Sequence, residues 1–409
     1  MLNMHLKRVI ALFSALVIMT LPALADTHTR EDVRAAYSAL DIDTDLDPYA
    51  ERPVISGDYA PGRLSDAAQN DAVEYLNFIR YLAYLDGSVA LDPLYGMRAQ
   101  HGAVLLAAND ELAHDAPRAA GMADGFYQTA LTGTMSSNIA AINWMDGDIL
   151  LVSVEYFVRD DGDFNLDTLG HRRWLLDPRL GKTGFGLANS ETGVSYTAMY
   201  VHDDSADARG WKSVKWPSEG AFPADLTSFD IPWSITLNPA VYADDFSNVT
   251  VDMYEKSAGR AELKCFLVST DNYGAGPCII FMPDLGKMGL ADYQQNQVWY
   301  VRVDGLRTID GGSASMEYSV EMMSLYPIDP SAVEVEPRSL QLSAGDTAQL
   351  TAQVIPEWAD DLNVSWSTTD PSVATVDECG TVTAVSEGEC GIVAVSVNGR
   401  SDECRITVK

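Results

Sequence analysis

Two segments of the chain carry histidines in surroundings that could support chemistry. His171 stands in GHRRW (170–174), a run that gathers an imidazole, two guanidinium groups and an indole in an acidic chain. His114 stands in the segment ELAHD (111–115), and both belong to a set of six histidines. Two neutral imidazoles with a carboxylate are ligands that Zn²⁺ accepts. The alternative is that each imidazole hydrogen-bonds a backbone carbonyl inside the domain, and the spacing does not decide between the two.

The two arginines of GHRRW also allow two interpretations. Arg172 and Arg173 could capture an anionic ligand. They could instead pair with one of the nearby carboxylates, Asp160, Asp161 or Asp177, and stack near Trp174. We favour the second interpretation, because carboxylates are abundant around the motif.

The acidic loop DDGDFNLDT (160–168) contains oxygen-bearing side chains at alternate positions, as calcium loops do. These residues are Asp161, Asp163, Asn165 and Asp167. However, Leu166 occupies the position of the required glycine, and Arg172 the position of the bidentate glutamate. We therefore expect a solvated acidic loop and no calcium site.

Other catalytic groups find little support in the sequence. Ser136, Ser137 and Ser153 lie near the motif, but no Gly-x-Ser-x-Gly elbow is present. No cysteine precedes residue 260, so the N-terminal half has no cysteine nucleophile. A pair of catalytic carboxylates, as in glycosidases, is compatible with the sequence, because Asp and Glu are abundant.

Several tryptophans fall in strand-like segments of the C-terminal half, among them Trp233, Trp299 and Trp366. They could form a platform on which a sugar stacks. Aromatic side chains of a β-sandwich core are the more common explanation.

Composition limits the partners. The chain has 59 acidic and 27 basic residues and a formal net charge of −32, so we exclude nucleic acid as a partner. Residues 1–25 read as a secretory signal peptide, with Lys7 and Arg8, an apolar stretch and an Ala-x-Ala site at residues 23–25. No later segment is apolar enough to predict a membrane span in the mature protein. We expect a secreted protein, extracellular or at the cell surface.

All five cysteines lie beyond residue 260, and in a secreted chain they predict disulfides with one thiol left over. Cys265 and Cys278 could close a hairpin. Cys379 and Cys390 flank a predicted strand whose ends are roughly 20 Å apart, too far for one disulfide. Cys379 with Cys404 is the expected second pair, which leaves Cys390 free.

The pattern of apolar residues divides the chain into segments. An irregular lead-in is expected over 26–62. Helical periodicity over 64–85, 91–115 and 147–159, with strands over 182–202, predicts an α+β domain at 63–213. Short strand-like segments predict a β-sandwich at 214–326, and seven or eight more predict a second one at 327–409. We expect the first two units to pack together, and the proline linker YPIDPS (326–331) to act as a semi-stiff hinge.

The last unit resembles the bacterial immunoglobulin-like group 2 domain. The segments that carry the resemblance are VEVEPRSLQLSAGDTAQLTAQVIP, VSWSTTDPSVATVDECGTVTAV and ECRITV. The resemblance implies a spacer or adhesion module of an extracellular bacterial protein.

The N-terminal half resembles the CAP superfamily, which includes cysteine-rich secretory, antigen 5 and pathogenesis-related proteins. The segments that carry this resemblance are YLNFIRYLAYL, LAHD, SSNIAA and LGHRRWLLDPRLGKTGFG. It implies an α-β-α sandwich with a cleft tetrad of two histidines and two glutamates. His114, His171 and Glu155 match three positions of the tetrad, and Ser137, beside Asn138, replaces the fourth. The resemblance thus implies a cleft that binds zinc weakly.

Two functions follow from these features. The first is a secreted CAP protein that binds an extracellular glycan, lipid, peptide or host protein; the sequence does not determine its oligomeric state. The second is a metal-assisted hydrolase in which His114, Glu155 and His171 hold an ion that activates water. We prefer the first, because Ser137 replaces a carboxylate that could act as ligand or base.

Overall fold

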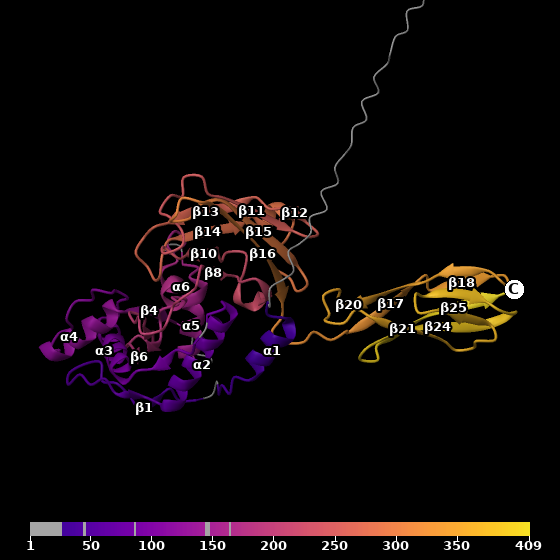
Figure 1. The fold of residues 1–409 in the computed structure, drawn as a ribbon. Coiled ribbons are helices and arrows are strands. Elements are labelled where there is room, and N and C mark those ends of the chain that lie inside the picture. The colour runs from indigo at the N-terminus through magenta and orange to yellow at the C-terminus, as the bar shows by residue number, and fades with distance from the viewer. Residues whose placement is uncertain (1–26, 44–45, 86, 144–147, 163–164) are drawn as a thin grey trace, which may run out of the picture.

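The computed structural model describes residues 27–43, 46–85, 87–143, 148–162 and 165–409, so the predicted signal peptide lies outside the described residues. The chain forms three parts (Figure 1): an α/β part, a β-sandwich that lies against it, and an immunoglobulin-like part that extends to one side as an arm. Among the described helices, none combines the length and the apolar composition needed to cross a bilayer.

The α/β part follows the predicted order of helices. Its helices are α2 (Asp66–Leu82), α3 (Pro93–Asn109), α4 (Asp124–Met135), α5 (Ile149–Arg159) and α6 (Gly170–Leu175). Its strands are β1 (Tyr49–Glu51), β2 (Arg63–Leu64), β3 (Ala90–Leu91), β4 (Ser137–Ile142), β5 (Lys182–Thr183), β6 (Phe185–Asn189) and β7 (Ser195–Tyr200). The segments predicted as helices at 64–85, 91–115 and 147–159 are α2, α3 and α5, whereas α4 and α6 were not predicted.

Local capping explains where the long helices begin. The Ser65 side chain accepts a hydrogen bond from Ala68 N, which satisfies one of the free amides at the start of α2. Pro93 occupies the first turn of α3, and Asp92 caps it. These residues fix the registers in which α2 and α3 turn their apolar faces inward.

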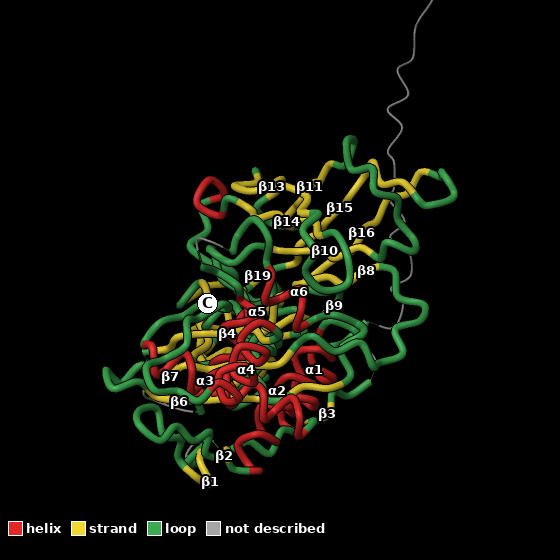
Figure 2. Tube along the Cα trace, turned by 90° about the vertical axis from the view of Figure 1, so that its left-hand side faces the viewer, coloured by secondary structure: helices red, strands yellow, loops and turns green. Residues whose placement is uncertain are grey.

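The strands β4, β7 and β6 form an antiparallel sheet in that order, with helices on both faces. Ile139 and Ala198 share a buried cluster with residues of α3. Their chain neighbours Ala140 and Met199 belong to another cluster, with residues of α2 and α5. Alternate side chains of a strand point to opposite faces, so this sheet separates two helix layers. Figure 2 shows the helices of this part gathered below the strands of the sandwich.

The glycines of KTGFG have a packing role. A Cβ atom at Gly184 would lie 2.0 Å from Gly96 N, and one at Gly186 would lie 2.2 Å from Ala99 O. Helix α3 therefore rests directly on the backbone around β6, which no larger residue would permit. Gln100 completes this contact, since its side chain hydrogen-bonds both Leu187 N and Leu187 O.

The sandwich consists of two sheets, β13-β14-β10-β8 and β12-β11-β15-β16-β9. Its strands are β8 (Ser213–Trp216), β9 (Gly220–Pro223), β10 (Trp233–Leu237), β11 (Thr250–Glu255), β12 (Gly259–Arg260), β13 (Leu263–Ser269), β14 (Cys278–Pro283), β15 (Val298–Arg307) and β16 (Ser313–Met323). One buried cluster runs from α2 and α5 into these strands. The α/β part and the sandwich therefore share one core, as expected from the sequence.

The tryptophans considered as a sugar platform serve the cores instead. Trp233 and Trp299 are fully buried in the sandwich. Trp366 packs against the core of the immunoglobulin-like part. Core packing, the alternative interpretation, is the one that the structure supports.

The immunoglobulin-like part has a core of its own. Its strands are β17 (Ala332–Glu336), β18 (Ser339–Leu342), β19 (Thr347–Gln349), β20 (Thr351–Ile355), β21 (Val364–Thr368), β22 (Ala374–Val376), β23 (Thr381–Ala384), β24 (Gly388–Ser396) and β25 (Ser401–Val408). They form sheets of order β17-β20, β18-β25-β24-β21 and β19-β23-β22.

The expected disulfides are absent: all five cysteines, which lie within the described part of the chain, are free. Cys265 on β13 lies opposite Met282 on β14, whereas Cys278 lies opposite Ser269. Met282 and Cys278 are four positions apart, about 13 Å along a strand. The two strands do pair, but their register keeps the two sulfurs apart.

The second predicted pair fails for a topological reason. Cys379 is exposed in the turn before β23, and β23 pairs with β19 and β22. Cys404 is buried in β25, which belongs to another sheet. The sequence suggested that the last strand returns beside Cys379, and the sheet order shows that it does not.

The lead-in over 26–62 is not irregular throughout. Residues Arg30–Ser38 form helix α1. Thr29 and Asp32 cap its N-terminus with a reciprocal capping box. Arg34 of this helix donates to Ser324 O at the end of the sandwich and pairs with Asp360 of the immunoglobulin-like part at 2.9 Å. Asp360 also accepts a hydrogen bond from Ile328 N. The linker that was expected to act as a hinge is therefore braced by contacts from both sides.

Candidate functional site

His114 lies beyond the end of α3, beside the last turn of α4. Its Nδ1 is 2.7 Å from Thr134 O, and the Thr134 hydroxyl donates to His114 O in return. Because a carbonyl can only accept, Nδ1 carries the proton and Nε2 is left as an acceptor. The residue is exposed, so this second nitrogen is available to a ligand.

His202 is a site residue that sequence reasoning missed. It follows β7, and its ring lies 4.6 Å from the ring of Trp174. Burial lowers the pKa of its imidazole, and the neighbouring His114 lowers it further. His202 is therefore neutral at pH 7. The available signal was a histidine at the end of a predicted strand.

His171 is held by hydrogen bonds to Asp160 and Asn138. Its Nδ1 lies 2.9 Å from Oδ1 of Asp160, a buried residue that ends α5 in a left-handed conformation with φ of 52°. The other oxygen of Asp160 accepts from Arg172 N at 3.2 Å. The Asn138 amide donates to His171 O at 2.9 Å, so Asn138 positions the histidine backbone.

We group five residues of this region under the name histidine row: His114, His202, Trp174, His171 and Asp160. His202 stacks near Trp174 and is influenced by His114, and His171 is bonded to Asp160. Helix α6 supplies the link in its centre. His171 and Trp174 are three residues apart on α6 and thus lie on one side of it. The row offers two exposed imidazoles, His114 and His202, a third imidazole that is mostly buried, an indole face and one buried carboxylate.

Glu155 does not belong to this row. It lies on α5 and accepts a hydrogen bond from the Tyr75 hydroxyl at 3.3 Å, with Arg159 at 3.9 Å. Burial raises the pKa of the Glu155 carboxyl. Its partners are thus a tyrosine of α2 and an arginine of its own helix, not the histidines.

Ser137 and Asn138 lie at the start of β4 and are both buried. Asn138 points to the side of His171, so Ser137 points to the opposite face of the sheet. The Ser137 hydroxyl has no hydrogen-bond partner among the described residues. Of the two residues predicted to line a cleft, only Asn138 contacts a predicted histidine.

The predicted zinc ligands therefore do not meet. Within the described residues, no group of three or more His, Cys, Asp and Glu side chains could hold a metal ion. Each predicted ligand is bonded elsewhere: His114 to Thr134 O of α4, His171 to Asp160, and Glu155 to Tyr75. The residues present do not fit a zinc ion with three protein ligands.

Arg172 neither captures an exposed anion nor pairs with a carboxylate through its guanidinium group. Its Nε donates to Val158 O, and its Nη2 donates to Arg159 O at the end of α5. Its Nη1 donates to Pro232 O at 2.6 Å and to the Ser234 hydroxyl at 3.2 Å, both in the sandwich. Complete burial lowers the pKa of the guanidinium to about 10.

Arg173 makes a second connection of the same kind. It donates to Thr168 O and to the Ser269 hydroxyl, each at 3.1 Å. Its other nitrogen donates to Asp271 O and Gly276 O at 2.6 and 2.8 Å. The interpretation as ion pairs is wrong: the two arginines fasten α6 to backbone carbonyls and hydroxyls of the sandwich.

The carboxylates named as partners are engaged elsewhere. Asp177 pairs with Arg179 at 2.6 Å. In the acidic loop, Asp161 pairs with Arg159 at 3.2 Å, while Asp163 lies outside the described residues. The described part of this loop is tied to α5 by an ion pair.

Comparison with known proteins identifies one part of the chain. Residues 331–407 match the family model of the bacterial Ig-like domain (group 2). The chain is similar to lacto-N-biosidase of Bifidobacterium bifidum, 46% identical over 70 residues, which is 17% of this chain and 6% of that protein. It is 33% identical to an alpha-L-arabinofuranosidase of Bifidobacterium longum subsp. longum over 135 residues, 32% of this chain and 12% of that protein.

A longer match is to the polysaccharide lyase 8 family protein HylA of Enterococcus faecalis, 35% identical over 257 residues. It covers 55% of this chain and 18% of that protein. The chain thus spans less than a fifth of each of these three relatives.

Among solved structures, domains 4 and 5 of the S-layer protein SbsC match at 14% identity with a TM-score of 0.19. This match covers 42% of this chain and 81% of that chain, and a TM-score this low carries no argument about the fold. The protein is a multidomain chain, mostly of β-sandwich parts with a few helices, and its residues 331–407 are a bacterial Ig-like group 2 domain.

Proposed function

We propose that the protein is a secreted bacterial protein of CAP type that acts by binding a ligand outside the cell. Three features support the CAP assignment: the segments LAHD and LGHRRW, the sheet β4-β7-β6, and the helix layers on both of its faces. The sequence of residues 1–25 supports secretion.

The observation that carries the binding function is the histidine row. His114 offers a free imidazole acceptor, His202 is neutral at pH 7, and Trp174 adds an indole beside them. Such a surface binds by hydrogen bonds and stacking, and it does not attract charged groups strongly. Of the ligand classes considered, glycan, lipid, peptide and protein, a glycan fits this chemistry best.

The relatives support the same class. Three of them are named as proteins that act on sugars: a lacto-N-biosidase, an arabinofuranosidase and a polysaccharide lyase family member. We propose that the Ig-like part serves here as a spacer that holds the rest of the protein at a distance from its point of attachment.

The test compares binding by the mature chain and by the double variant His114→Ala/His202→Ala on an immobilised panel of bacterial envelope glycans. We expect the variant to lose at least tenfold in apparent affinity. His101→Ala is the matched control, since its Nδ1 also bonds a backbone carbonyl, Met97 O, at 2.7 Å, but outside the row. Equal binding by all three proteins would refute a role of the row.

A hydrolase is the second candidate, and one observation favours it. Asp160 orients His171 through Nδ1, and a buried carboxylate in this position is typical of a histidine that acts as a general base. The described residues do not fit the zinc ion that the CAP resemblance implies, so this candidate relies on His171 and Asp160. Peptide or ester hydrolysis that is lost in His171→Ala and kept in His114→Ala would establish this candidate.

A further inference from the structure

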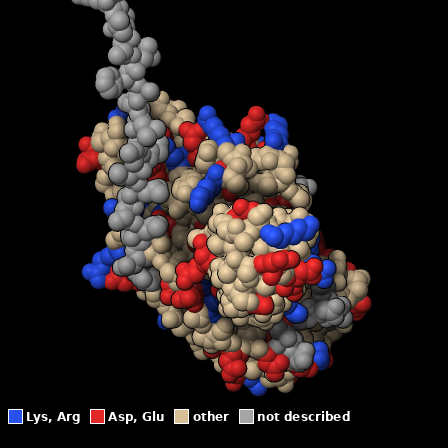
Figure 3. Space-filling view, turned by 90° about the vertical axis from the view of Figure 1, so that its right-hand side faces the viewer, with Lys and Arg blue, Asp and Glu red and all other residues tan. Residues whose placement is uncertain are grey.

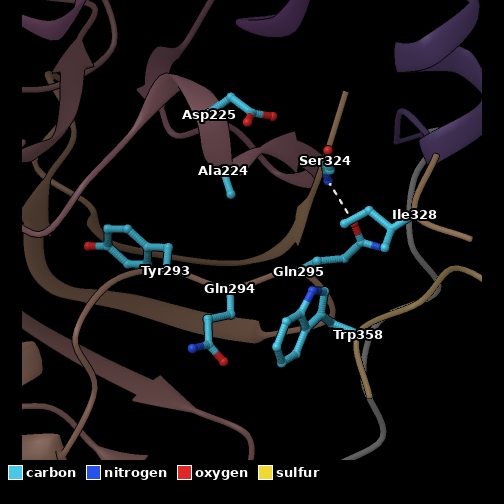
Figure 4. Close-up of a pocket in the computed structure, with 8 residues that line it drawn as sticks. All are labelled: Ala224, Asp225, Tyr293, Gln294, Gln295, Ser324, Ile328 and Trp358. Carbon is cyan, nitrogen blue, oxygen red and sulfur yellow. Dashed lines mark hydrogen bonds between the residues drawn. The ribbon is translucent and has the colours of Figure 1, made fainter. Parts of the chain in front are cut away.

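A pocket lies where the sandwich meets the Ig-like part, far along the chain from the histidine row. Its volume is about 270 Å³. The lining residues that matter for its chemistry are Asp225, Tyr293, Gln294, Gln295, Ile328 and Trp358. Figure 4 shows that Ala224 and Asp225 lie on one side of the pocket and that Gln294 and Trp358 lie on the other. The wall thus combines two parts of the protein.

The wall on the side of the sandwich is fixed by hydrogen bonds. The Tyr293 hydroxyl points away from the pocket and accepts from Trp233 Nε1 at 2.8 Å. The side-chain oxygen Oε1 of Gln295 accepts from Ser324 N at 3.2 Å, the bond drawn in Figure 4. Asp225 accepts from Leu325 N at 3.2 Å. These side chains are therefore held in place before any ligand arrives.

The wall on the side of the Ig-like part is anchored by Asp360. Its carboxylate receives Arg34 at 2.9 Å and the Gln295 amide at 3.0 Å. Its backbone amide donates to Ile328 O at 2.9 Å. Trp358 lies two residues before this anchor, and Ala359 between them is buried. The position of the indole relative to the sandwich is thus determined by contacts that span the junction.

Two lining groups remain free for a ligand. Trp358 is 47% exposed, whereas Trp233 and Trp299 are fully buried. In the part of the chain that the structure describes, neither the Trp358 indole nor the Gln294 side-chain amide has a hydrogen-bond partner. An aromatic face beside an amide that can both donate and accept suits a ring with apolar C–H groups on its face and hydroxyls on its edge.

The volume of the pocket and the charge around it restrict the class of ligand further. The volume is slightly below the roughly 300 Å³ at which pockets for drug-sized ligands begin, which corresponds to one small ring. Asp225 contributes negative charge to the wall, and the chain carries a net charge of −32. Figure 3, which faces the Ig-like part, shows patches of acidic side chains on its surface. An anionic ligand would be repelled here.

We propose that this junction pocket binds one neutral sugar residue of an extracellular glycan, with Trp358 stacked on the ring and Gln294 bonded to its hydroxyls. The inference is independent of the histidine row. It adds a second contact to the same class of ligand, and the pocket exists only while the Ig-like part is docked on the sandwich.

The experiment measures binding of the full mature chain to immobilised oligosaccharides that end in N-acetylgalactosamine, galactose or L-arabinose, with a hyaluronan oligosaccharide as the anionic probe. We expect at least one neutral probe to bind, and both Trp358→Ala and Gln294→Ala to weaken it at least tenfold. Tyr254→Ala is the matched control, because Tyr254 is an aromatic side chain of similar exposure, 48%, outside the pocket. The melting temperature of each variant shows that it is folded.

The outcomes separate cleanly. Neutral-sugar binding that is lost in both pocket variants and kept in Tyr254→Ala supports the proposal, whatever happens to the His114/His202 variant. Absence of binding to every neutral probe, unchanged binding in Trp358→Ala, or preference for hyaluronan would overturn it. Loss of binding in the histidine variant alone would support the proposed function and refute the pocket.

Discussion

The two junctions of this protein are built differently. At the first, between the α/β part and the sandwich, one apolar core continues across the boundary, and two buried arginines fasten it. At the second, between the sandwich and the Ig-like part, each side has its own core, and the connection is a polar cluster around Asp360. We therefore expect the α/β part and the sandwich to unfold together. The Ig-like part, in contrast, can separate from the sandwich without loss of either core.

The largest expected effect is on the first junction. Arg172→Ala removes every hydrogen bond from its guanidinium and leaves buried carbonyls without a donor. We expect the free energy of unfolding to fall by at least about 3 kcal/mol, because each unsatisfied buried polar group costs about 1–3 kcal/mol. Chemical denaturation measures this change. The control is Arg209→Ala, an exposed arginine whose ion pair within the described residues is with Asp207, for which we expect no measurable change.

This comparison would be weakened if Arg172→Ala unfolded the sandwich and the α/β part in two separate transitions. Such a result would mean that the shared core does not couple the two parts. A single transition at lower denaturant concentration is the outcome that the continuous core predicts.

The second junction should respond by opening rather than by unfolding. Asp360→Ala removes the acceptor shared by Arg30, Arg34 and Gln295. We expect both cores to keep their melting transitions, while limited proteolysis within 326–331 becomes several-fold faster and small-angle scattering reports a larger radius of gyration.

Asp361→Ala is the control for the second junction, because the side chain of Asp361 accepts hydrogen bonds, among the residues described, from Asn363 of its own loop alone. Added salt should accelerate cleavage in the wild type, since it screens the partly exposed ion pairs of Asp360. Cleavage at an unchanged rate in Asp360→Ala would show that the linker is rigid without this cluster.

The smallest expected effect is a pH dependence at the first junction. His28 stacks between Tyr81 and Tyr84 at 4.0 and 4.1 Å, and its carbonyl accepts from Ala221 N of the sandwich. Burial lowers the pKa of the His28 imidazole, against a smaller opposing effect of Asp32. The unfolded chain therefore binds a proton more readily than the folded one. The stabilisation is complete above the unfolded pKa of about 6.5 and decreases as the pH falls below it.

His28→Phe keeps the stacking but cannot take up a proton. Between pH 7.5 and 5, its melting temperature should fall less than that of the wild type. Identical pH profiles for the two proteins would show that the environment of His28 does not differ between the folded and unfolded states.

Sequence patterns predicted those elements whose signal is local. The long helices α2, α3 and α5 were predicted because apolar residues repeat at helical spacing and caps mark their starts. The Ig-like part was predicted from its alternating short strands. Helix α1 was not predicted, because Val33 is its single buried residue and the helix therefore lacks a repeated apolar pattern.

The site was harder to predict, because it depends on which face of the sheet each residue occupies. The resemblance to CAP proteins identified His114 and His171 but joined them to Glu155, whose side chain points to Tyr75. The neighbours of His202 and Trp358 come from segments that are distant in the sequence, and no local pattern reveals such contacts. The roles of Arg172 and Arg173 likewise depend on carbonyls some 60 to 100 positions further along the chain.

Helix α6 carries both the centre of the histidine row and the two arginines that hold the sandwich. Within these six residues, the side chains serve two purposes: His171 and Trp174 face the proposed ligand, and Arg172 and Arg173, which lie between them in the sequence, reach into the neighbouring part. Contacts with the sandwich thus determine the position of α6 and of the site residues that it carries. Substitutions in loops of the sandwich, at positions that no ligand touches, would shift α6 and change the orientation of His171 and Trp174. Ligand preference could therefore diverge between related proteins while every residue of the row stays the same.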